Sequence, residues 1–331
     1  MQYCELGTTG IEVSRVAMGC WAIVGDATWG PQDEQDALRT IEAALDLGIN
    51  FFDTAEGYGD GYSEELLGRA LTGRHNEAVI ATKVSQSNLH RNDVIAACDA
   101  SLKRLGRDCI DLYQVHWPTW DVPMEETFSA LEKLRDQGKV RAIGVSNFGP
   151  RDLSDAIRHT RIESNQLPYN LLLRAIEHDV QPVCAEHGIG ILCYSPLAQG
   201  LLTGKFAAAD DVPEGRARTR HFSGDRAQAR HGEPGHETEM FNAIHAVKRI
   251  SERINQPMAD VALAWLLQQP AVTSVLAGAR RIDQVSQNAA AAELELDDAT
   301  LAELDEATRP LKDAMGVNPD PWLPADNARM R

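Results

Sequence analysis

The chain has 331 residues, of which 43% are hydrophobic and 24% charged, a composition that suits a globular protein with a sizeable core. Its 49 acidic side chains outnumber its 32 basic ones, which gives a formal net charge of −17. A surface of that sign repels nucleic-acid phosphates and anionic lipid head groups, so neither is expected as a main partner.

The N-terminal residues show no basic stretch followed by an apolar run, and no segment reaches about 18 consecutive apolar residues. The sequence therefore predicts neither a secretory signal nor a membrane helix. Cysteines are spread along the chain without a Cys-x-x-Cys pair, at Cys4, Cys20, Cys98, Cys109, Cys184 and Cys193. Reduced thiols and a cytoplasmic location are expected.

Beyond turn signals at Gly7 and Gly10, apolar runs typical of buried strands alternate with segments of helical periodicity. The strand-like runs are 16–19, 50–54, 79–83, 110–116, 140–146, 163–168, 189–195 and 273–278. Helical spacing is clearest over 36–47, 94–105 and 124–134, each followed by a glycine suited to a C-cap. This alternation predicts a parallel sheet, either open and doubly wound or closed into a barrel.

No Gly-x-Gly-x-x-Gly follows the first strand, which argues against the dinucleotide-binding loop of an open sheet. We therefore expect residues 1–331 to form one domain, a single (β/α)8 TIM barrel. The stretch from Thr203 to Glu237 lacks apolar periodicity and predicts a long loop between strands seven and eight, either a lid or a binding loop. The proline-rich tail after Arg309 is expected to be irregular.

Function in such a barrel gathers at the C-terminal ends of the strands. Polar side chains stand at these positions on successive strands: Asp53, Lys83, His116, Ser146, Asn147, Gln166, Tyr194, Ser195 and 278–281. Each of them, taken alone, could be a purely structural residue, such as a turn former, a snorkelling lysine or a core histidine. Their recurrence at one rim is instead typical of an active site.

Asp53, Tyr58, Lys83 and His116 together form a unit suited to protonating a carbonyl oxygen. A phenol has a pKa of about 10, and we expect the Lys83 ammonium to favour the phenolate and bring the pKa of Tyr58 closer to neutrality. Asp53 is expected to keep Lys83 charged, and His116 to hydrogen-bond the substrate oxygen. The hydride that carbonyl reduction also needs has to come from a cofactor.

Family motifs occur in one order along most of the chain, at 53–59, 63–68, 81–83, 111–118, 138–148, 165–170, 194–205 and 278–280. Through these motifs the chain strongly resembles the aldo-keto reductase superfamily. The segments 19–23 and 29–30 and the proline-rich C-terminus are most similar to bacterial members related to the inositol-utilisation and general-stress reductases.

The resemblance implies a (β/α)8 barrel with NAD(P)H extended across its C-terminal mouth. It implies Tyr58 as general acid, Lys83 and Asp53 as the pair that tunes it, and His116 as the donor that orients the substrate. The positions that match the family's cofactor contacts are Ser146, Asn147 and Gln166 at the carboxamide, Tyr194 at the nicotinamide ring, Ser195, Leu197, Gly200 and Leu201 along the pyrophosphate, and Gly278, Arg280, Gln284 and Asn288 at the adenosine end.

Two adjacent arginines, Arg280 and Arg281, indicate the type of cofactor. A guanidinium suits a 2′-phosphate, so NADPH is expected over NADH, with no metal ion. Aromatic side chains at Trp21, Tyr58 and Trp117, with His116 and Trp29, are expected to wall the substrate pocket. Such a wall favours a small carbonyl substrate, either a sugar-like or an aromatic aldehyde.

Other functions compete with this interpretation. Asp53 and Glu56 could serve a barrel hydrolase, although three residues along a loop fix no separation. A slow redox sensor or regulatory subunit, like the potassium-channel β subunits that share this fold and cofactor, would carry the same residues. An NAD-dependent sugar or polyol dehydrogenase is a further alternative. His221, His231 and His236 could bind a metal, although no helical His-x-x-x-His pattern accompanies them.

Overall fold

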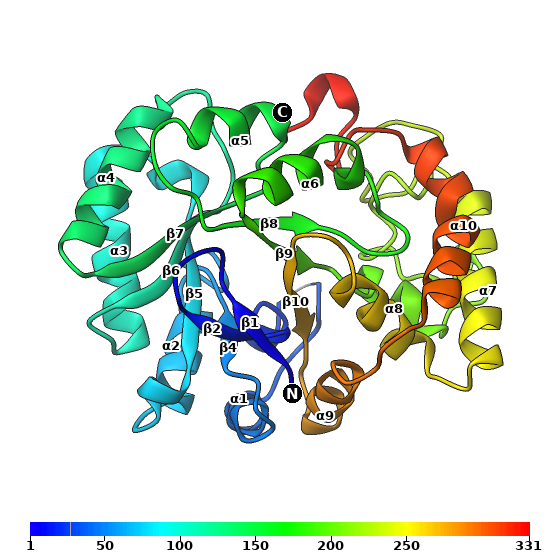
Figure 1. Cartoon of the computed structure of the whole chain (residues 1–331), viewed down its shortest axis with the longest axis horizontal. Coiled ribbons are helices and arrows are strands. Elements are labelled where there is room, and N and C mark those ends of the chain that lie inside the picture. Colours follow the sequence, from blue (N-terminus) through cyan, green and yellow to red (C-terminus); the bar gives the residue numbers. More distant parts are fainter. Residues whose placement is uncertain (27) are drawn as a thin grey trace.

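The structure is a computed structural model that describes residues 1–26 and 28–331. In this part of the chain, eight parallel strands close into a barrel in the order β10-β3-β4-β5-β6-β7-β8-β9 (Figure 1). The barrel strands are β3 (Val16–Gly19), β4 (Phe51–Asp53), β5 (Val79–Val84), β6 (Ile110–Val115), β7 (Val140–Ser146), β8 (Ser164–Pro168), β9 (Gly190–Tyr194) and β10 (Val272–Gly278). The predicted barrel is confirmed, and each strand begins and ends within one residue of its predicted run.

Helices surround the barrel on its outside (Figure 1). They are α1 (Glu34–Asp46), α2 (Tyr62–Ala70), α3 (Arg91–Leu105), α4 (Met124–Asp136), α5 (Pro150–Ala156), α6 (Ile176–His187), α7 (Glu237–Arg253), α8 (Met258–Leu267), α9 (Ile282–Ala291) and α10 (Asp298–Met315). Gly106 ends α3 in the left-handed conformation expected of a C-cap, with φ of 65°. Among the described residues, no helix combines the length and apolar character needed to cross a membrane.

The hydrophobic core has two parts, one between the strands and the helices and one inside the barrel. The inner part is closed by an N-terminal antiparallel hairpin, β1 (Tyr3–Glu5) and β2 (Glu12–Ser14), which the sequence did not predict beyond its turn signals. Leu6, Ile11 and Val13 of this hairpin segment pack against inward-facing residues such as Phe51 and Leu112. The hairpin therefore leaves the opposite rim, at the strands' C-terminal ends, as the open one.

The first residues of the C-terminal tail are helical, although an irregular structure was predicted for them. We expected irregular chain after Arg309, but α10 continues through Pro310 to Met315. The buried side chains Leu304, Leu311 and Met315 pack into the outer core, and this packing outweighs the hydrogen bond that Pro310 cannot donate. From Gly316 to Arg331 the tail is largely irregular, as predicted.

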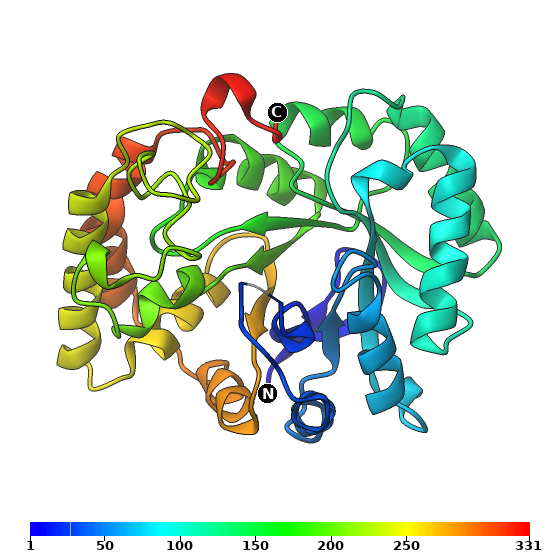
Figure 2. The same ribbon diagram turned by 180° about the vertical axis from the view of Figure 1, so that it is seen from behind.

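The long loop between β9 and α7 is irregular over most of 203–237, as predicted, but it is firmly attached to the tail. Figure 2 shows this loop beside α10 and the C-terminal segment. Arg220 donates from its main-chain N–H to Pro321 O at 2.7 Å and from its guanidinium to Asn318 O and Met315 O. The side chains of Phe222 and Val212 are buried. The loop and the tail thus form one side of the barrel mouth.

Candidate active site

A cleft of about 830 Å³ opens at the C-terminal ends of the strands. Asp53 ends β4, Tyr58 follows in the next loop, Lys83 stands near the end of β5, and His116 directly follows β6. Asp53, Tyr58 and His116 line the cleft, and Lys83 lies beneath Tyr58 with its ammonium 4.8 Å from the centre of the phenol ring. The four residues that the sequence suggested for proton transfer are therefore brought together.

Lys83 is fully buried, and its Nζ lies 2.7 Å from Asp53 Oδ1, 2.8 Å from Thr54 O and 3.2 Å from the hydroxyl oxygen of Tyr58. Burial alone would lower the pKa of Lys83, but the charge of Asp53 and the hydrogen bonds outweigh it and raise that pKa above its ordinary value. Lys83 thus stays a cation in the interior, as the sequence led us to expect.

For Tyr58, the predicted direction of the pKa shift was wrong. The phenol lies between Trp21, stacked at 6.1 Å, and His116, edge-on at 5.8 Å between ring centres. Burial among these groups raises the pKa of Tyr58; the charge of Lys83 lowers it, but less, and Asp53 adds to the rise. The hydroxyl therefore keeps its proton at neutral pH, which is the state a proton donor needs.

His116 is held in its neutral form, because burial and the nearby charge of Lys83 lower its pKa to about 3. Its main chain fixes its place, since His116 N donates to Val84 O at 3.0 Å and His116 O accepts from Asn147 Nδ2 at 3.0 Å. A neutral imidazole carries one N–H donor and one acceptor, so it can donate to an oxygen without adding charge.

We expect the free energy of unfolding to fall as the pH drops from 6.5 towards 3, partly because of His116. Its folded pKa of about 3 lies below the ordinary 6.5, so the unfolded chain binds more protons throughout this window. The sign is therefore loss of stability on acidification, at a slope from this side chain that reaches about 1.4 kcal/mol per pH unit in the middle of the window.

Denaturant unfolding at a series of pH values measures that slope, and His116→Gln is expected to make it shallower. Burial lowers the pKa of His221 to about 4, so this second histidine contributes in both proteins and leaves part of the slope in place. The same slope in the variant and the wild type would contradict the assignment of His116 as a half-buried side chain held in its neutral form.

The second oxygen of Asp53 is held by two glutamine side chains. Gln166 Nε2 donates to Asp53 Oδ2 at 2.7 Å, and Gln114 Nε2 donates to the same atom at 3.3 Å. Gln166 was predicted as a cofactor contact and lines the cleft, whereas Gln114 was not singled out from the sequence. The carboxylate therefore receives N–H donors on both of its oxygens.

The residues expected at the nicotinamide carboxamide form a hydrogen-bonded group on one wall of the cleft. Asn147 Nδ2 donates to Ser146 Oγ at 3.0 Å, and Asn147 Oδ1 accepts from the Tyr194 hydroxyl at 2.8 Å. Asn147 has a φ of 63°, a conformation that asparagine tolerates better than most residues. Ser146 Oγ donates to Gln166 O at 3.1 Å, so the group is continuous with β8.

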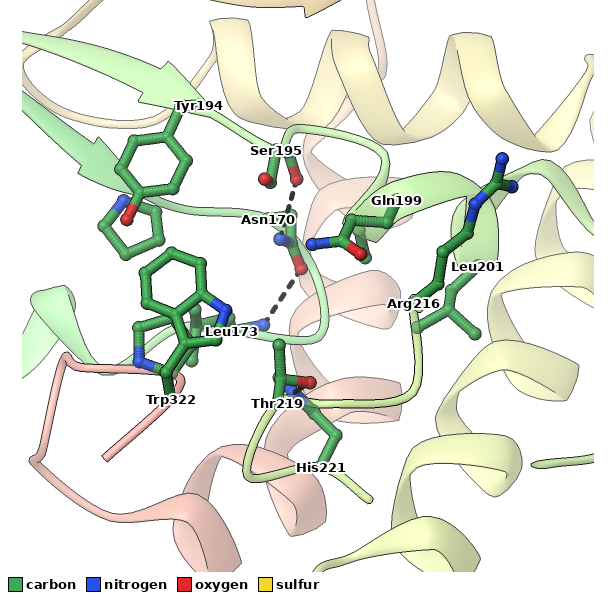
Figure 3. A pocket seen from close by; sticks show the side chains of 13 residues that line it. Asn170, Leu173, Tyr194, Ser195, Gln199, Leu201, Arg216, Thr219, His221 and Trp322 are labelled. Atoms are coloured by element: carbon green, nitrogen blue, oxygen red, sulfur yellow. Dashed lines mark hydrogen bonds between the residues drawn. The ribbon is translucent and has the colours of Figure 1, made fainter. Parts of the chain in front are cut away.

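The predicted pyrophosphate segment forms a sharply turned edge of the cleft. Ser195, Ala198, Gln199 and Gly200 all have positive φ, and backbone strain of this kind concentrates at functional sites. Figure 3 shows Asn170 supporting the edge, with its amide donating to Ser195 O at 3.0 Å. Ser195, Leu197 and Gly200 line the cleft, whereas Leu201 is buried and lines a smaller cavity beside it.

Two cations that the sequence did not single out face this edge. Lys205 and Arg216 both line the cleft, and a Cβ added at Gly200 would lie 2.7 Å from Lys205 Nζ and 3.8 Å from Arg216 Nη1. Among residues 1–26 and 28–331, neither has a carboxylate within ion-pair distance. Burial and the charge of Arg216 lower the pKa of Lys205. Unpaired cations on a protein of net charge −17 indicate an anion-binding position.

Of the residues predicted to contact the adenosine end of the cofactor, most line the cleft but one does not. Gly278, Arg280, Arg281 and Gln284 line the cleft, whereas Asn288 is buried in α9. The Arg280 guanidinium is used within the chain: Nε donates to Gln32 Oε1 at 2.7 Å, and the terminal nitrogens donate to main-chain oxygens of 29–31. Arg281 is exposed and pairs with the equally exposed Asp283 at 2.9 Å. Arg280 therefore ties down the loop before α1, and Arg281 is the more available of the two.

Trp21, Trp29 and Trp117 line the cleft as predicted, and the tail adds a fourth tryptophan, Trp322, that the sequence did not suggest. Trp322 stacks on Tyr194 at 6.2 Å with an angle of 10° between the rings. Arg329 lies over Trp117 at 3.9 Å and is held by Asp320, to which its Nε donates at 3.0 Å. No short sequence pattern links a tail residue to this wall, because the contact is made only in three dimensions.

The residues of the competing carboxylate and histidine sites have structural roles. Glu56 Oε1 accepts from Ser85 N at 2.7 Å and from Asn88 Nδ2 at 2.9 Å, so it supports the loop after β5, while Asp53 is paired with Lys83. His221 Nε2 contacts Leu172 O at 2.9 Å and His231 Nδ1 accepts from Glu233 N at 3.1 Å. In the described part of the chain, no group of three potential metal ligands is found.

Comparisons with known proteins agree with the fold. The model of the aldo/keto reductase family matches residues 15–309. The chain therefore belongs to the aldo/keto reductase family and is an oxidoreductase that acts on carbonyl compounds.

Among the similar proteins, one is named for NADH and another was solved with NADPH. The chain is 36% identical to aldo-keto reductase YhdN of Bacillus subtilis (strain 168), over 86% of this chain and 87% of that protein. It is 34% identical to the NADH-specific methylglyoxal reductase of Escherichia coli (strain K12), over 90% and 96%. An aldo-keto reductase from Klebsiella pneumoniae, solved in complex with NADPH, superposes with a TM-score of 0.71 at 29% identity and covers 89% of this chain and 91% of that one.

Proposed function

We propose that residues 1–331 act as one catalytic domain that reduces an aldehyde or ketone to an alcohol, with NADPH as hydride donor and Tyr58 as general acid. The observation that carries this proposal is the Tyr58 hydroxyl at the cleft, 3.2 Å from a buried ammonium that is itself paired with Asp53. This arrangement supplies a proton and stabilises the anion left behind.

The cleft's residues suit a dinucleotide. Lys205 and Arg216 offer positive charge for the pyrophosphate at the strained edge of Gly200, and the wall of Ser146, Asn147 and Gln166 offers amide and hydroxyl groups for the carboxamide. Tyr194, which lines the cleft, would hold the nicotinamide ring. When bound, the cofactor supplies the hydride.

Tyr58 gives its proton to the carbonyl oxygen as the carbonyl carbon receives the hydride. The phenolate that remains accepts a hydrogen bond from the Lys83 ammonium, and Asp53 neutralises the charge of Lys83 in the interior. Neutral His116 donates to the same carbonyl oxygen and holds it against the Tyr58 hydroxyl. No net charge is left on the product, because one hydride and one proton are added together.

The substrate wall is aromatic and uncharged, with Trp21, Trp117 and Trp322 beside Tyr58 and the neutral His116. Flat aromatic faces suit an aromatic ring or the C–H face of a sugar. We therefore propose an uncharged aromatic or sugar-like aldehyde as the substrate class.

Cofactor choice depends on the adenosine end of the cleft, where NADPH carries a 2′-phosphate and NADH does not. Arg281 can leave its exposed partner Asp283 at little cost, since pairs of this kind contribute about 0–1 kcal/mol, and it is our proposed contact for the 2′-phosphate of NADPH. Lys205, which lines the cleft, would hold the pyrophosphate that NADPH and NADH share. The two side chains therefore make different predictions for the two cofactors.

Titration of the purified protein with NADPH and with NADH, followed through tryptophan fluorescence, tests this assignment. Lys205→Met is expected to lower the affinity for both cofactors by about ten-fold. Arg281→Ala is expected to lower the affinity for NADPH alone, also by about ten-fold. Arg309→Ala, which removes an exposed arginine paired with Glu306 on α10, is the matched control and is expected to change neither affinity.

Each other result has a definite meaning. Tighter binding of NADH than of NADPH, unchanged by Arg281→Ala, would replace the NADPH proposal with the NADH preference named for the Escherichia coli relative. Saturable binding without turnover of any aldehyde would favour a slow redox sensor. Failure to bind either cofactor would overturn the proposed function.

A further inference from the structure

Gln114 stands behind the proton-transfer group without reaching the cleft. Its side chain is fully buried at the end of β6, and the residues that line the cleft in the described part of the chain do not include it. Its amide nitrogen lies 3.3 Å from Asp53 Oδ2, and its amide oxygen lies 3.5 Å from Gln166 Nε2. Gln114 therefore contacts both Asp53 and Gln166, which are hydrogen-bonded to each other.

The barrel makes room for this side chain. Gln114 pairs in register with Lys83 on β5 and with Gly144 on β7, so these three residues are neighbours across adjacent strands. A Cβ at Gly144 would lie 3.1 Å from Gln114 Cγ and 2.4 Å from Ser164 Oγ. The absence of a side chain at Gly144 therefore gives the glutamine its space next to Lys83.

A buried ion pair needs partners for its remaining hydrogen-bonding positions, because its charges have lost water. Oδ1 of Asp53 is taken by Lys83, and Oδ2 depends on the two glutamine amides. Gln166 lines the cleft, so a bound molecule competes for its amide, whereas Gln114 has no such competitor. Gln114 is thus the donor that stays with Asp53 while the cleft is occupied.

We propose that Gln114 is a positioning residue for the reaction: its amide fixes the orientation of the Asp53 carboxylate, so that Oδ1 stays on Lys83 and Lys83 stays on the Tyr58 oxygen. This inference rests on the proposed function, because it assigns Gln114 a part in the same proton transfer. It acts through Asp53 and touches neither substrate nor cofactor.

Two variants of similar size separate positioning from mere filling of space. Gln114→Met keeps the length of the side chain but removes the donor, and it is expected to lower kcat by about ten-fold with KM and cofactor affinity within about two-fold of wild type. Gln114→Glu can donate to Asp53 Oδ2 only while its carboxyl is protonated. Two carboxyl groups that share one site hold a proton to higher pH than either would alone.

The expected signature is therefore a difference in pH profile. The kcat of Gln114→Glu is expected near the wild-type value at acid pH and to fall with an additional ionisation as the pH rises, whereas Gln114→Met is lower at every pH. Thermal unfolding and cofactor titration of both variants establish that they are folded with an intact cleft.

A space-filling role predicts the opposite pattern. Equal kcat for Gln114→Met and wild type, or a Gln114→Glu profile parallel to wild type, would overturn the inference while leaving the proposed function in place. A variant that does not fold would also overturn it, since the assignment to positioning requires that the barrel tolerate a methionine there. A folded wild-type protein that binds cofactor but reduces no aldehyde would overturn both proposals together.

Discussion

Replacing Tyr58 by phenylalanine is expected to lower kcat for aldehyde reduction by roughly 10²–10⁴-fold, the range that general acid catalysis contributes. The reason is that the variant would keep an aromatic ring between Trp21 and His116 but lose the proton that the carbonyl oxygen needs. Cofactor affinity is expected to stay within about two-fold, because the hydroxyl bonds Lys83 rather than the cofactor wall. Steady-state kinetics and fluorescence titration measure the two quantities.

A matched control separates proton donation from packing. Tyr62→Phe also removes a phenol hydroxyl, one that donates to Glu34 Oε2 on the outside of the barrel, and is expected to leave kcat unchanged. If Tyr58→Phe turned over a reactive aldehyde at the wild-type rate, His116 or water would have to be the acid, and the assignment of Tyr58 would be wrong.

Replacing Lys83 by methionine is expected to damage both stability and catalysis. The variant leaves the Asp53 carboxylate buried without its counter-charge, and breaking a buried pair in this way costs about 3–5 kcal/mol of unfolding free energy. It also removes the cation that stabilises the phenolate of Tyr58, so kcat is expected to fall by about 10²-fold or more. Denaturant unfolding and steady-state kinetics measure the two losses.

The double variant Lys83→Met with Asp53→Asn is the control for this experiment. It removes the stranded charge, so most of the lost stability is expected to return, while catalysis stays lost because no ammonium faces Tyr58. Full stability in the single variant would show that Asp53 is not charged in the interior. Wild-type kcat in the double variant would show that the pair has no part in the reaction.

Much of the fold could be predicted from the sequence because a parallel barrel has a strong local pattern. Its strands are buried on both faces and therefore appear as short apolar runs, such as Val16–Gly19 and Val140–Ser146, whose predicted bounds the structure reproduces. Glycines at helix ends, such as Gly106, separate these runs from the crossovers. The residues Asp53, Lys83 and His116 could be found because they end consecutive strands, and barrel closure brings strand ends together.

What the sequence did not predict depends on contacts between distant segments. Trp322 reaches the substrate wall only because α10 carries the tail back across the barrel mouth, and Gln114 becomes important only through its distance to Asp53. The shift in the pKa of Tyr58 was predicted in the wrong direction. Burial of the phenol outweighs the charge of Lys83, and the extent of that burial cannot be predicted from a sequence motif. Arg280 was expected to be free for the cofactor, but the loop before α1 supplies its acceptors.

The central claim is that the chain couples oxidation of NADPH to protonation of a carbonyl oxygen by Tyr58. Its most direct test follows NADPH consumption and alcohol formation together, with the purified wild-type protein and an uncharged aromatic aldehyde, beside Tyr58→Phe. We predict one alcohol formed for each NADPH oxidised by the wild type, and a loss of roughly 10²-fold or more in the variant. NADPH bound by a folded wild-type protein but not oxidised in the presence of any aldehyde tried, or oxidised equally by both proteins, would contradict it.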